Sequence, residues 1–177
     1  MSETLPVPVD DGAAAHLVGT QLPPIALPAT DGSTIDLAAL PGLVVVFAYP
    51  RTGRPGEPSL TDDWATIPGA SGCTPQTCRF RDLNAEFAAL GARVFGLSTQ
   101  DTDYQREMVE RLTVPFPVLS DADLALARAL RLPTFEAAGL TLLKRMAWIA
   151  REGVIERVFY PVFPPERNAD DVLAALR

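Results

Sequence analysis

The sequence lacks the features that mark nucleic-acid-binding, membrane-spanning and disulfide-stabilised proteins. It carries 15 Lys and Arg against 22 Asp and Glu, so it has no basic excess with which to neutralise phosphates. An anionic membrane surface is an equally poor partner for a net charge of −7, and no apolar run approaches the ~20 residues that a spanning helix needs. The two cysteines are too few for a disulfide framework. We therefore expect neither nucleic acid nor a membrane as a partner.

The length and the hydrophobic content of the chain indicate one globular domain. With 177 residues, 47% of them hydrophobic, the chain is long enough to bury roughly 70% of its unfolded surface. We expect a single domain over residues 1–177, in which residues 1–20, which show little periodicity, form a surface extension. The first residues, MSETLPVPVDD, are acidic and contain prolines, unlike a signal peptide, so we expect a cytoplasmic protein.

Strands and helices are expected to alternate along the chain. An Asp-Gly turn within 23–40 predicts a hairpin near the N-terminus, and the unbroken apolar run at 43–49 predicts a strand that is buried on both faces. A last helix is expected at the C-terminus, with Asn168 as its cap. Further strands are expected at 93–97, 116–119, 144–150 and 154–160. This order predicts an α/β sandwich in which helices flank a mixed central sheet.

A long loop precedes both cysteines. Residues 51–69 are rich in proline, glycine and charge, and a loop of this length is uncommon in a compact domain without a functional reason. Cys73 and Cys78 follow directly, and after them apolar residues recur at helical spacing. Cys73 is therefore expected near the start of a helix.

The close pair of cysteines has two interpretations. One is redox chemistry, and the other is that both are small buried core residues, as free cysteines often are. A zinc site would need further ligands, and the single histidine, His16, is far away in the sequence. Count and spacing alone leave both interpretations open.

The position of Cys73 favours the chemical interpretation. Unpaired backbone amides and the helix dipole at the first turn of a helix stabilise an anion such as a thiolate, the nucleophilic form of cysteine. Within an intact helix, however, residues five apart have Cα atoms roughly 8–9 Å apart, beyond the ~7 Å that a disulfide can bridge. A bond between Cys73 and Cys78 would therefore require the first turns to unwind.

A set of motifs resembles one protein family. The run GCTPQTCRFRD follows VVVFAYP, and it is accompanied by the DG hairpin, an LST turn, PFPVLSD and a late Arg-bearing strand that ends in an EG turn. Together, from about Gln21 to the C-terminus, these motifs resemble the peroxiredoxins of the bacterioferritin-comigratory (Q) type, which are thiol peroxidases with a thioredoxin-like fold. The sequence departs from the family twice. Ala70 stands three residues before Cys73, where the family has Thr or Ser, and residues 51–69 look like an insertion before the active-site helix.

The resemblance implies a role for each matching residue. Cys73 corresponds to the peroxidatic cysteine and Cys78 to the resolving cysteine. Arg145 corresponds to the arginine beside the peroxidatic thiolate, and Pro50 to the proline of the active-site motif. Ser71, the hydroxyl nearest to the position of the missing threonine, is expected to take over its role. No metal, haem or flavin cofactor is implied.

The function implied by the resemblance is a thiol-dependent peroxidase of antioxidant defence. Hydrogen peroxide or an organic hydroperoxide would oxidise Cys73 to a sulfenic acid, Cys78 would convert it to an intramolecular disulfide, and thioredoxin or a similar dithiol would reduce the disulfide. The chain would be a monomer or a homodimer. The alternatives are a thiol–disulfide oxidoreductase on the same fold, which normally carries C-x-x-C, and a thioredoxin-like binding domain without catalysis. The C-x4-C spacing and Arg145 argue against the oxidoreductase.

Overall fold

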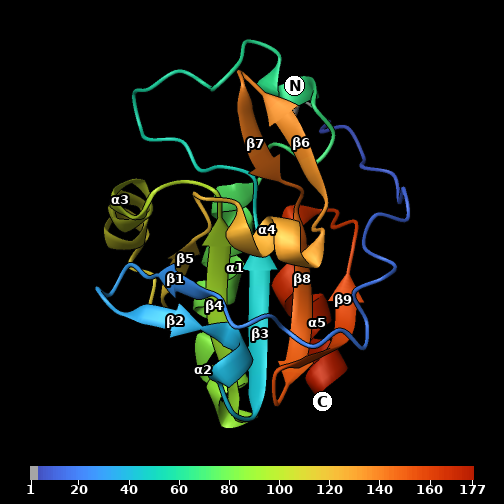
Figure 1. Cartoon of the computed structure of the whole chain (residues 1–177). Coiled ribbons are helices and arrows are strands. Elements are labelled where there is room, and N and C mark those ends of the chain that lie inside the picture. The colour runs from blue at the N-terminus through green and yellow to red at the C-terminus, as the bar shows by residue number, and fades with distance from the viewer. Residues whose placement is uncertain (1–3) are drawn as a thin grey trace.

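A mixed five-stranded sheet lies at the centre of the protein, whose computed structural model describes residues 4–177 (Figure 1). In spatial order its strands are β5 (Val118–Ser120), β4 (Ala92–Ser98), β3 (Leu43–Ala48), β8 (Met146–Arg151) and β9 (Val154–Phe159). The strands β3, β4 and β5 run parallel to one another. β8 pairs antiparallel with β3, and β9 pairs antiparallel with β8, so the sheet is mixed as expected.

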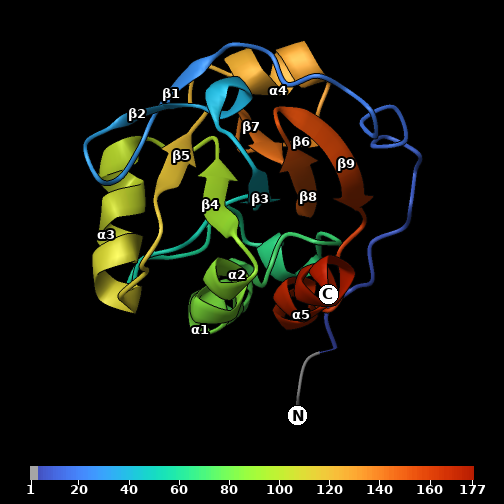
Figure 2. The ribbon, with the colours of Figure 1, turned by 90° about the horizontal axis from the view of Figure 1, so that it is seen from below.

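Helices and a hairpin cover the two faces of this sheet (Figure 2). One face carries α1 (Cys73–Asp82), α2 (Asn84–Ala89) and α5 (Asn168–Leu176). The other carries the hairpin of β1 (Ala26–Pro28) and β2 (Thr34–Asp36), the short 3-10 helix η1 (Leu37–Ala39) and α4 (Ala125–Leu130). Beside β5, at the sheet edge, lies α3 (Thr102–Leu112). The predicted α/β sandwich with an N-terminal hairpin is thereby confirmed. Within the described residues, no helix has the length and apolar character needed to cross a bilayer.

The unbroken apolar run of β3 explains its central position. Val44 and Val46 pack into a hydrophobic cluster on one face of the sheet, and Val45 and Phe47 pack into a second cluster on the other face. Side chains alternate along a strand, so a strand that is apolar at every position is buried on both faces. Phe47 also stacks on Phe80 of α1, with 4.3 Å between the ring centroids, and this contact holds α1 against the sheet.

The structure differs from the sequence-based expectations in several places, including β5, which begins at Val118 and not at residue 116. β6 (Thr134–Ala137) and β7 (Leu140–Leu143) form an antiparallel hairpin, not predicted, that extends beyond the central sheet (Figure 1). The last helix begins at Asn168 and its first turn has no side-chain cap, so the capping role expected of Asn168 was wrong. The strand expected at 144–150 begins at Met146, which leaves Arg145 immediately before β8.

The 51–69 segment, predicted to be an insertion, is an irregular loop that contains one short 3-10 helix, η2 (Trp64–Thr66). Several contacts anchor it, among them hydrogen bonds between Thr52 and Gln100 and two contacts of its aromatic and basic side chains. The guanidinium of Arg54 lies 4.2 Å from the ring centroid of Tyr104 on α3, and the ring of Trp64 packs against Phe135 of β6 at 6.2 Å. The contact of Trp64 with Phe135 therefore holds the loop against the β6–β7 hairpin.

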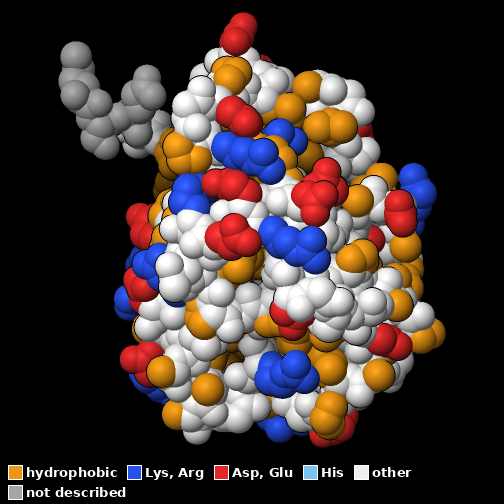
Figure 3. All heavy atoms as spheres, turned by 90° about the vertical axis from the view of Figure 1, so that its left-hand side faces the viewer, with side chains coloured by type: hydrophobic (Ala, Val, Ile, Leu, Met, Phe, Trp, Pro, Cys, Tyr) orange, Lys and Arg blue, Asp and Glu red, His pale blue; other side chains and the backbone are white. Residues whose placement is uncertain are grey.

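On the face around α3, basic and acidic side chains are interspersed (Figure 3), as in the ion pair of Arg54 with Glu107.

Candidate active site

Cys73 is the first residue of α1 and is 4% exposed. The residue before it, Gly72, has a φ of +110°, a backbone conformation that side-chain-bearing residues rarely adopt. A Cβ at Gly72 would also collide with the ring of Pro165. Glycine therefore lets the helix begin tightly against the segment before α5. The first turn of α1 has no side-chain cap, Pro75 has no N–H, and the N–H of Gln76 donates to the carbonyl of Gly72, so the backbone N–H groups of Cys73 and Thr74 remain available to stabilise an anion.

Arg145 contacts the thiol of Cys73 from the start of β8. Its Nη2 atom lies 3.3 Å from Sγ. The same atom donates to the carbonyl oxygens of Gly69, Ala70 and Ser71 at distances of 3.1–3.3 Å. The arginine residue is only 3% exposed. One buried guanidinium thus binds both the cysteine and the loop that leads into it.

The guanidinium of Arg145 forms no ion pair with a carboxylate of residues 4–177. Its hydrogen bonds go to neutral oxygens and to the sulfur of Cys73. Arginine stays protonated in proteins, and a buried charge without an opposite charge is costly. The surroundings therefore favour a negative charge on the ionisable group in contact with the guanidinium, which is Cys73. This arrangement suits a thiolate.

Gln76 holds the other end of the guanidinium. Its Oε1 accepts a hydrogen bond from Nη1 of Arg145, and its Nε2 donates to Oδ1 of Asn168 at 2.9 Å. All three side chains are buried. The sequence analysis missed Gln76, although its spacing of three from Cys73 places both on one face of α1. Gln76 thereby fixes the orientation of Arg145 relative to the thiol.

A free hydrogen-bond donor remains on Arg145. Its Nε atom is buried and has no hydrogen-bond partner within the described residues. Nε and Nη2 share one edge of the planar guanidinium, the edge with which Arg79 binds both oxygens of Asp170. Nε is therefore a buried donor, next to the nitrogen that contacts Sγ of Cys73, that no atom of the described residues occupies.

Two buried hydroxyl groups accompany the thiol. Tyr49 follows β3 and packs in the same hydrophobic cluster as Cys73, and Thr77 lies one helical turn after Cys73 in α1. Neither hydroxyl has a hydrogen-bond partner within residues 4–177. Burial raises the pKa of Tyr49, and negative charge on Cys73 adds to the rise, so its phenol stays protonated as a neutral donor. Sequence analysis singled out neither hydroxyl.

The other predicted site residues take different positions. Ser71 contributes its backbone carbonyl to Arg145, and its hydroxyl makes no hydrogen bond to Cys73 in the described structure. Pro50 is buried directly after Tyr49. Of the residues predicted for the site, the structure thus brings the side chain of Arg145 into hydrogen-bonding contact with Cys73.

Cys78 lies in the same helix as Cys73 and is partly exposed, and both cysteines are free thiols. Because α1 runs without a break from Cys73 to Asp82, regular helix geometry puts the two Cα atoms roughly 8–9 Å apart. This separation exceeds the reach of a disulfide, so bond formation would require the first turns of α1 to unwind.

Comparison with known proteins places this arrangement in a family. A family model described as Redoxin matches residues 17–173. The chain is 29% identical over 161 residues to the chloroplastic peroxiredoxin Q of Populus jackii, covering 90% of this chain and 67% of that protein. It is 33% identical over 139 residues to peroxiredoxin bcp1 of Schizosaccharomyces pombe, covering 77% of this chain and 61% of that protein. The chain thus spans about two thirds of the length of these relatives.

The fold matches solved structures of the same kind. The crystal structure of peroxidoxin BcpB from Mycobacterium tuberculosis superposes with a TM-score of 0.73 at 28% identity, covering 90% of this chain and 96% of that one. Sequence and fold therefore agree with the motifs around Cys73 and Arg145. The chain belongs to the Redoxin family, as a peroxiredoxin of the bacterioferritin-comigratory (Q) type with a thioredoxin-like fold, and it is a peroxidase enzyme.

Proposed function

We propose that this peroxiredoxin reduces hydrogen peroxide and organic hydroperoxides at Cys73, with Cys78 as the resolving cysteine and thioredoxin or a similar dithiol as the reductant. The observation that carries the proposal is the contact of 3.3 Å between Sγ of Cys73 and a buried arginine without a carboxylate partner in the described residues. A neutral peroxide can approach such a pair because it brings no charge of its own.

In the first step the Cys73 thiolate attacks one peroxide oxygen. The S–O bond forms as the O–O bond breaks, so the sulfur is oxidised to a sulfenic acid and the other oxygen leaves, after protonation, as water or alcohol. Arg145 would stabilise the charge that develops on the oxygens, since its Nη2 already contacts the sulfur and its Nε is unoccupied. Pro50 and the hydroxyl of Ser71 are proposed to shield and position the peroxide.

In the second step Cys78 attacks the oxidised sulfur of Cys73. An S–S bond forms, the S–O bond breaks, and the oxygen leaves as water with the thiol proton. An external dithiol then reduces the disulfide by exchange and is itself oxidised to a disulfide. The proposal includes a cytoplasmic location and a monomer or homodimer. The plant relatives, in contrast, are named as chloroplastic.

A coupled peroxidase assay tests the proposal. Reduced protein is mixed with thioredoxin, thioredoxin reductase, NADPH and hydrogen peroxide, and NADPH consumption is followed. We expect turnover by the wild type, none by Cys73→Ser, and no sustained turnover by Cys78→Ser. Insulin reduction is measured in parallel as a control for general thiol–disulfide exchange. Insulin reduction without peroxide consumption would establish the alternative oxidoreductase and contradict the peroxidase proposal.

A further inference from the structure

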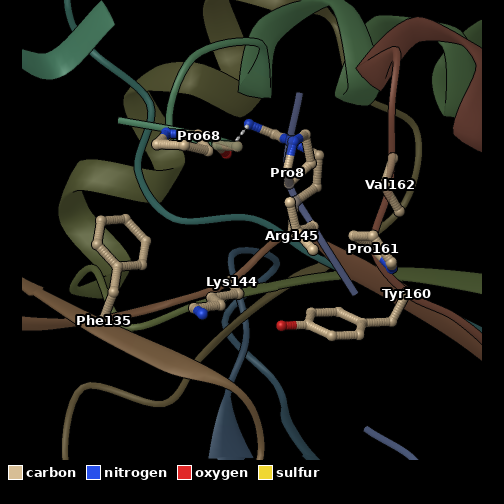
Figure 4. Close-up of a pocket in the computed structure, with 10 residues that line it drawn as sticks. Pro8, Pro68, Phe135, Lys144, Arg145, Tyr160, Pro161 and Val162 are labelled. Carbon is tan, nitrogen blue, oxygen red and sulfur yellow. Dashed lines mark hydrogen bonds between the residues drawn. The ribbon is translucent and has the colours of Figure 1, made fainter. Parts of the chain in front are cut away.

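A hollow borders the side chain of Arg145 (Figure 4). It encloses about 440 Å³ of empty space, part of which is open to solvent. Its wall is mainly apolar, whereas Lys144, Arg145 and Tyr160 contribute polar groups. The apolar and backbone parts of the wall come from Pro8, Val9, Pro68, Gly69, Phe135, Pro161 and Val162. The hollow thus lies next to the guanidinium that holds the Cys73 thiol.

Residues 5–11, here called the N-terminal strap, cover this region from outside. Pro8 and Val9 form part of the wall of the hollow, and Pro8 lies close to Gly69 in the loop that leads to Cys73. Leu5 in turn lines a second, smaller hollow together with Ser71. The strap therefore forms part of the wall of both hollows, and it packs against the loop that Arg145 binds.

The side chain of Asp11 joins the strap to the rest of the protein. We call its contacts with Lys144 and Tyr160 the Asp11 clasp. Asp11 accepts a hydrogen bond from Nζ of Lys144 at 3.0 Å and another from the hydroxyl of Tyr160 at 2.8 Å. Both carboxylate oxygens are thus engaged, and both partners line the hollow. Lys144 is also the residue immediately before Arg145.

Apart from this clasp, the strap is held loosely. Val7 is 60% exposed and Val9 is 81% exposed. Within residues 4–177, the strap forms no backbone–backbone hydrogen bond with the rest of the chain. A segment with few buried contacts and no backbone pairing opens at low free-energy cost. The Asp11 clasp is therefore one of the contacts that keep the strap closed, and its loss should shift the strap towards the open state.

We propose that the strap is a lid that limits the size of the hydroperoxide admitted to Arg145, and that Asp11 determines this specificity. The inference rests on the proposed peroxidase function. A peroxide whose oxygens are bound by Arg145 extends its organic group into the adjoining hollow. The outer wall of that hollow is Pro8 and Val9, so a bulky aromatic group fits only when the strap moves outward. Hydrogen peroxide has no organic group and does not require this movement.

The test compares the rates at which the Asp11→Asn variant reacts with cumene hydroperoxide and with hydrogen peroxide. Asp11→Asn keeps the shape of the side chain but removes its charge, so the ion pair with Lys144 is lost and the contact with Tyr160 is weakened. Because an exposed ion pair shifts an equilibrium only modestly, we expect the second-order rate constant for cumene hydroperoxide to rise about two- to fivefold. The constant for hydrogen peroxide should stay unchanged. Asp10→Asn is the matched control, since Asp10 is also exposed and accepts a hydrogen bond from the backbone N–H of Gly12 within its own turn.

Amide hydrogen exchange of residues 5–11 provides the second measurement. Faster exchange of the strap in Asp11→Asn, together with the selective gain for cumene hydroperoxide, would support the lid. Faster exchange with an unchanged ratio of the two rate constants would overturn it, and so would unchanged exchange. Failure of the wild type to consume either peroxide would instead remove the peroxidase function on which the lid depends. The two failures are therefore distinguishable.

Discussion

Arg145 and Cys73 are 72 positions apart in the sequence, yet Nη2 of the arginine lies 3.3 Å from Sγ of the cysteine. Each of the two residues is held in place by another part of the fold. The cysteine depends on Gly72 for the tight start of α1, and the arginine depends on the antiparallel pairing of β8 with β3. A buried positive charge and an ionisable thiol are thereby brought together, and within the described residues no carboxylate competes for the charge.

Replacement of Arg145 by alanine should slow the reaction of reduced protein with hydrogen peroxide by at least about tenfold, since loss of a charge-assisted contact of this kind costs more than ~1.4 kcal/mol. Rapid-mixing kinetics with hydrogen peroxide check the effect. Lys144→Ala serves as the control, because its ammonium group contacts Asp11 and not the thiol. Equal rates for Arg145→Ala and the wild type would contradict the role of the arginine.

Replacement of Gln76 by leucine should destabilise the protein and slow peroxide reduction. The change leaves Nη1 of Arg145 and Oδ1 of Asn168 without their partner in a buried environment, which costs about 1–3 kcal/mol. Urea unfolding gives the free-energy change. Asn168→Leu removes the other end of the same network, so the double variant should lose less stability than the sum of the two single variants. Strict additivity would show that the two side chains do not act together.

Replacement of Gly72 by alanine should destabilise the start of α1. The new Cβ would meet Pro165 and would require a φ of +110°, so we expect a loss of about 1–3 kcal/mol in the free energy of unfolding. Gly12→Ala is the matched control: Gly12 also has a positive φ, of +75°, but nothing lies within 4 Å of a Cβ there. A loss no larger than that of the control would mean that the packing against Pro165 contributes little.

The ion pair of Arg79 with Asp170 should make the packing of α1 on α5 sensitive to acid. The hydrogen bond from Arg79 holds the pKa of the Asp170 carboxyl below its ordinary value. A lowered pKa in the folded state means that the pair stabilises the protein above the ordinary carboxyl pKa, and that this contribution is lost as the pH falls through the lowered value. Since both side chains are about 40% exposed, the effect should stay below about 1 kcal/mol. Unfolding of Asp170→Asn, followed from pH 7 downwards, should show a weaker acid dependence than the wild type.

Oxidation should unfold the beginning of α1. Cys73 and Cys78 lie in one unbroken helix, and a disulfide between them requires one or two turns to open. Amides of residues 69–82 should therefore exchange faster in the oxidised protein than in the reduced protein, and dithiothreitol should reverse the change. Equal protection in both redox states, with the disulfide confirmed by mass, would contradict this expectation.

Local signals in the sequence predicted the central strand β3 and the helix that begins near Cys73. The apolar run of β3 and the helical spacing after Cys73 each depend on neighbouring residues, and the structure confirms both elements. The hairpin of β6 and β7 was missed because its turn, Ala138-Gly139, lacks the usual Asn-Gly or Asp-Gly signal although both residues have a positive φ.

The contacts around Arg145 could not be predicted in the same way. Asn168 stands at a helix start, where a cap is the usual local role, and its contact with Gln76 across 92 positions overrides that preference. The clasp of Asp11 with Lys144 spans 133 positions and has no local signal at all. Such long-range polar contacts follow from the packed structure and leave no periodic pattern.

The reaction of Cys78→Ser with a single equivalent of hydrogen peroxide tests directly whether Cys73 attacks the peroxide. Reduced protein is mixed with peroxide and a sulfenic-acid-specific label, and peroxide consumption and protein mass are measured together, with Cys73→Ser as the comparison. We expect Cys78→Ser to consume about one equivalent rapidly and to carry the label at Cys73, as a thiolate nucleophile would. Cys73→Ser should consume almost none. Rapid consumption by Cys73→Ser, with an unreactive Cys78→Ser, would contradict the assignment of Cys73 as the residue that attacks the peroxide.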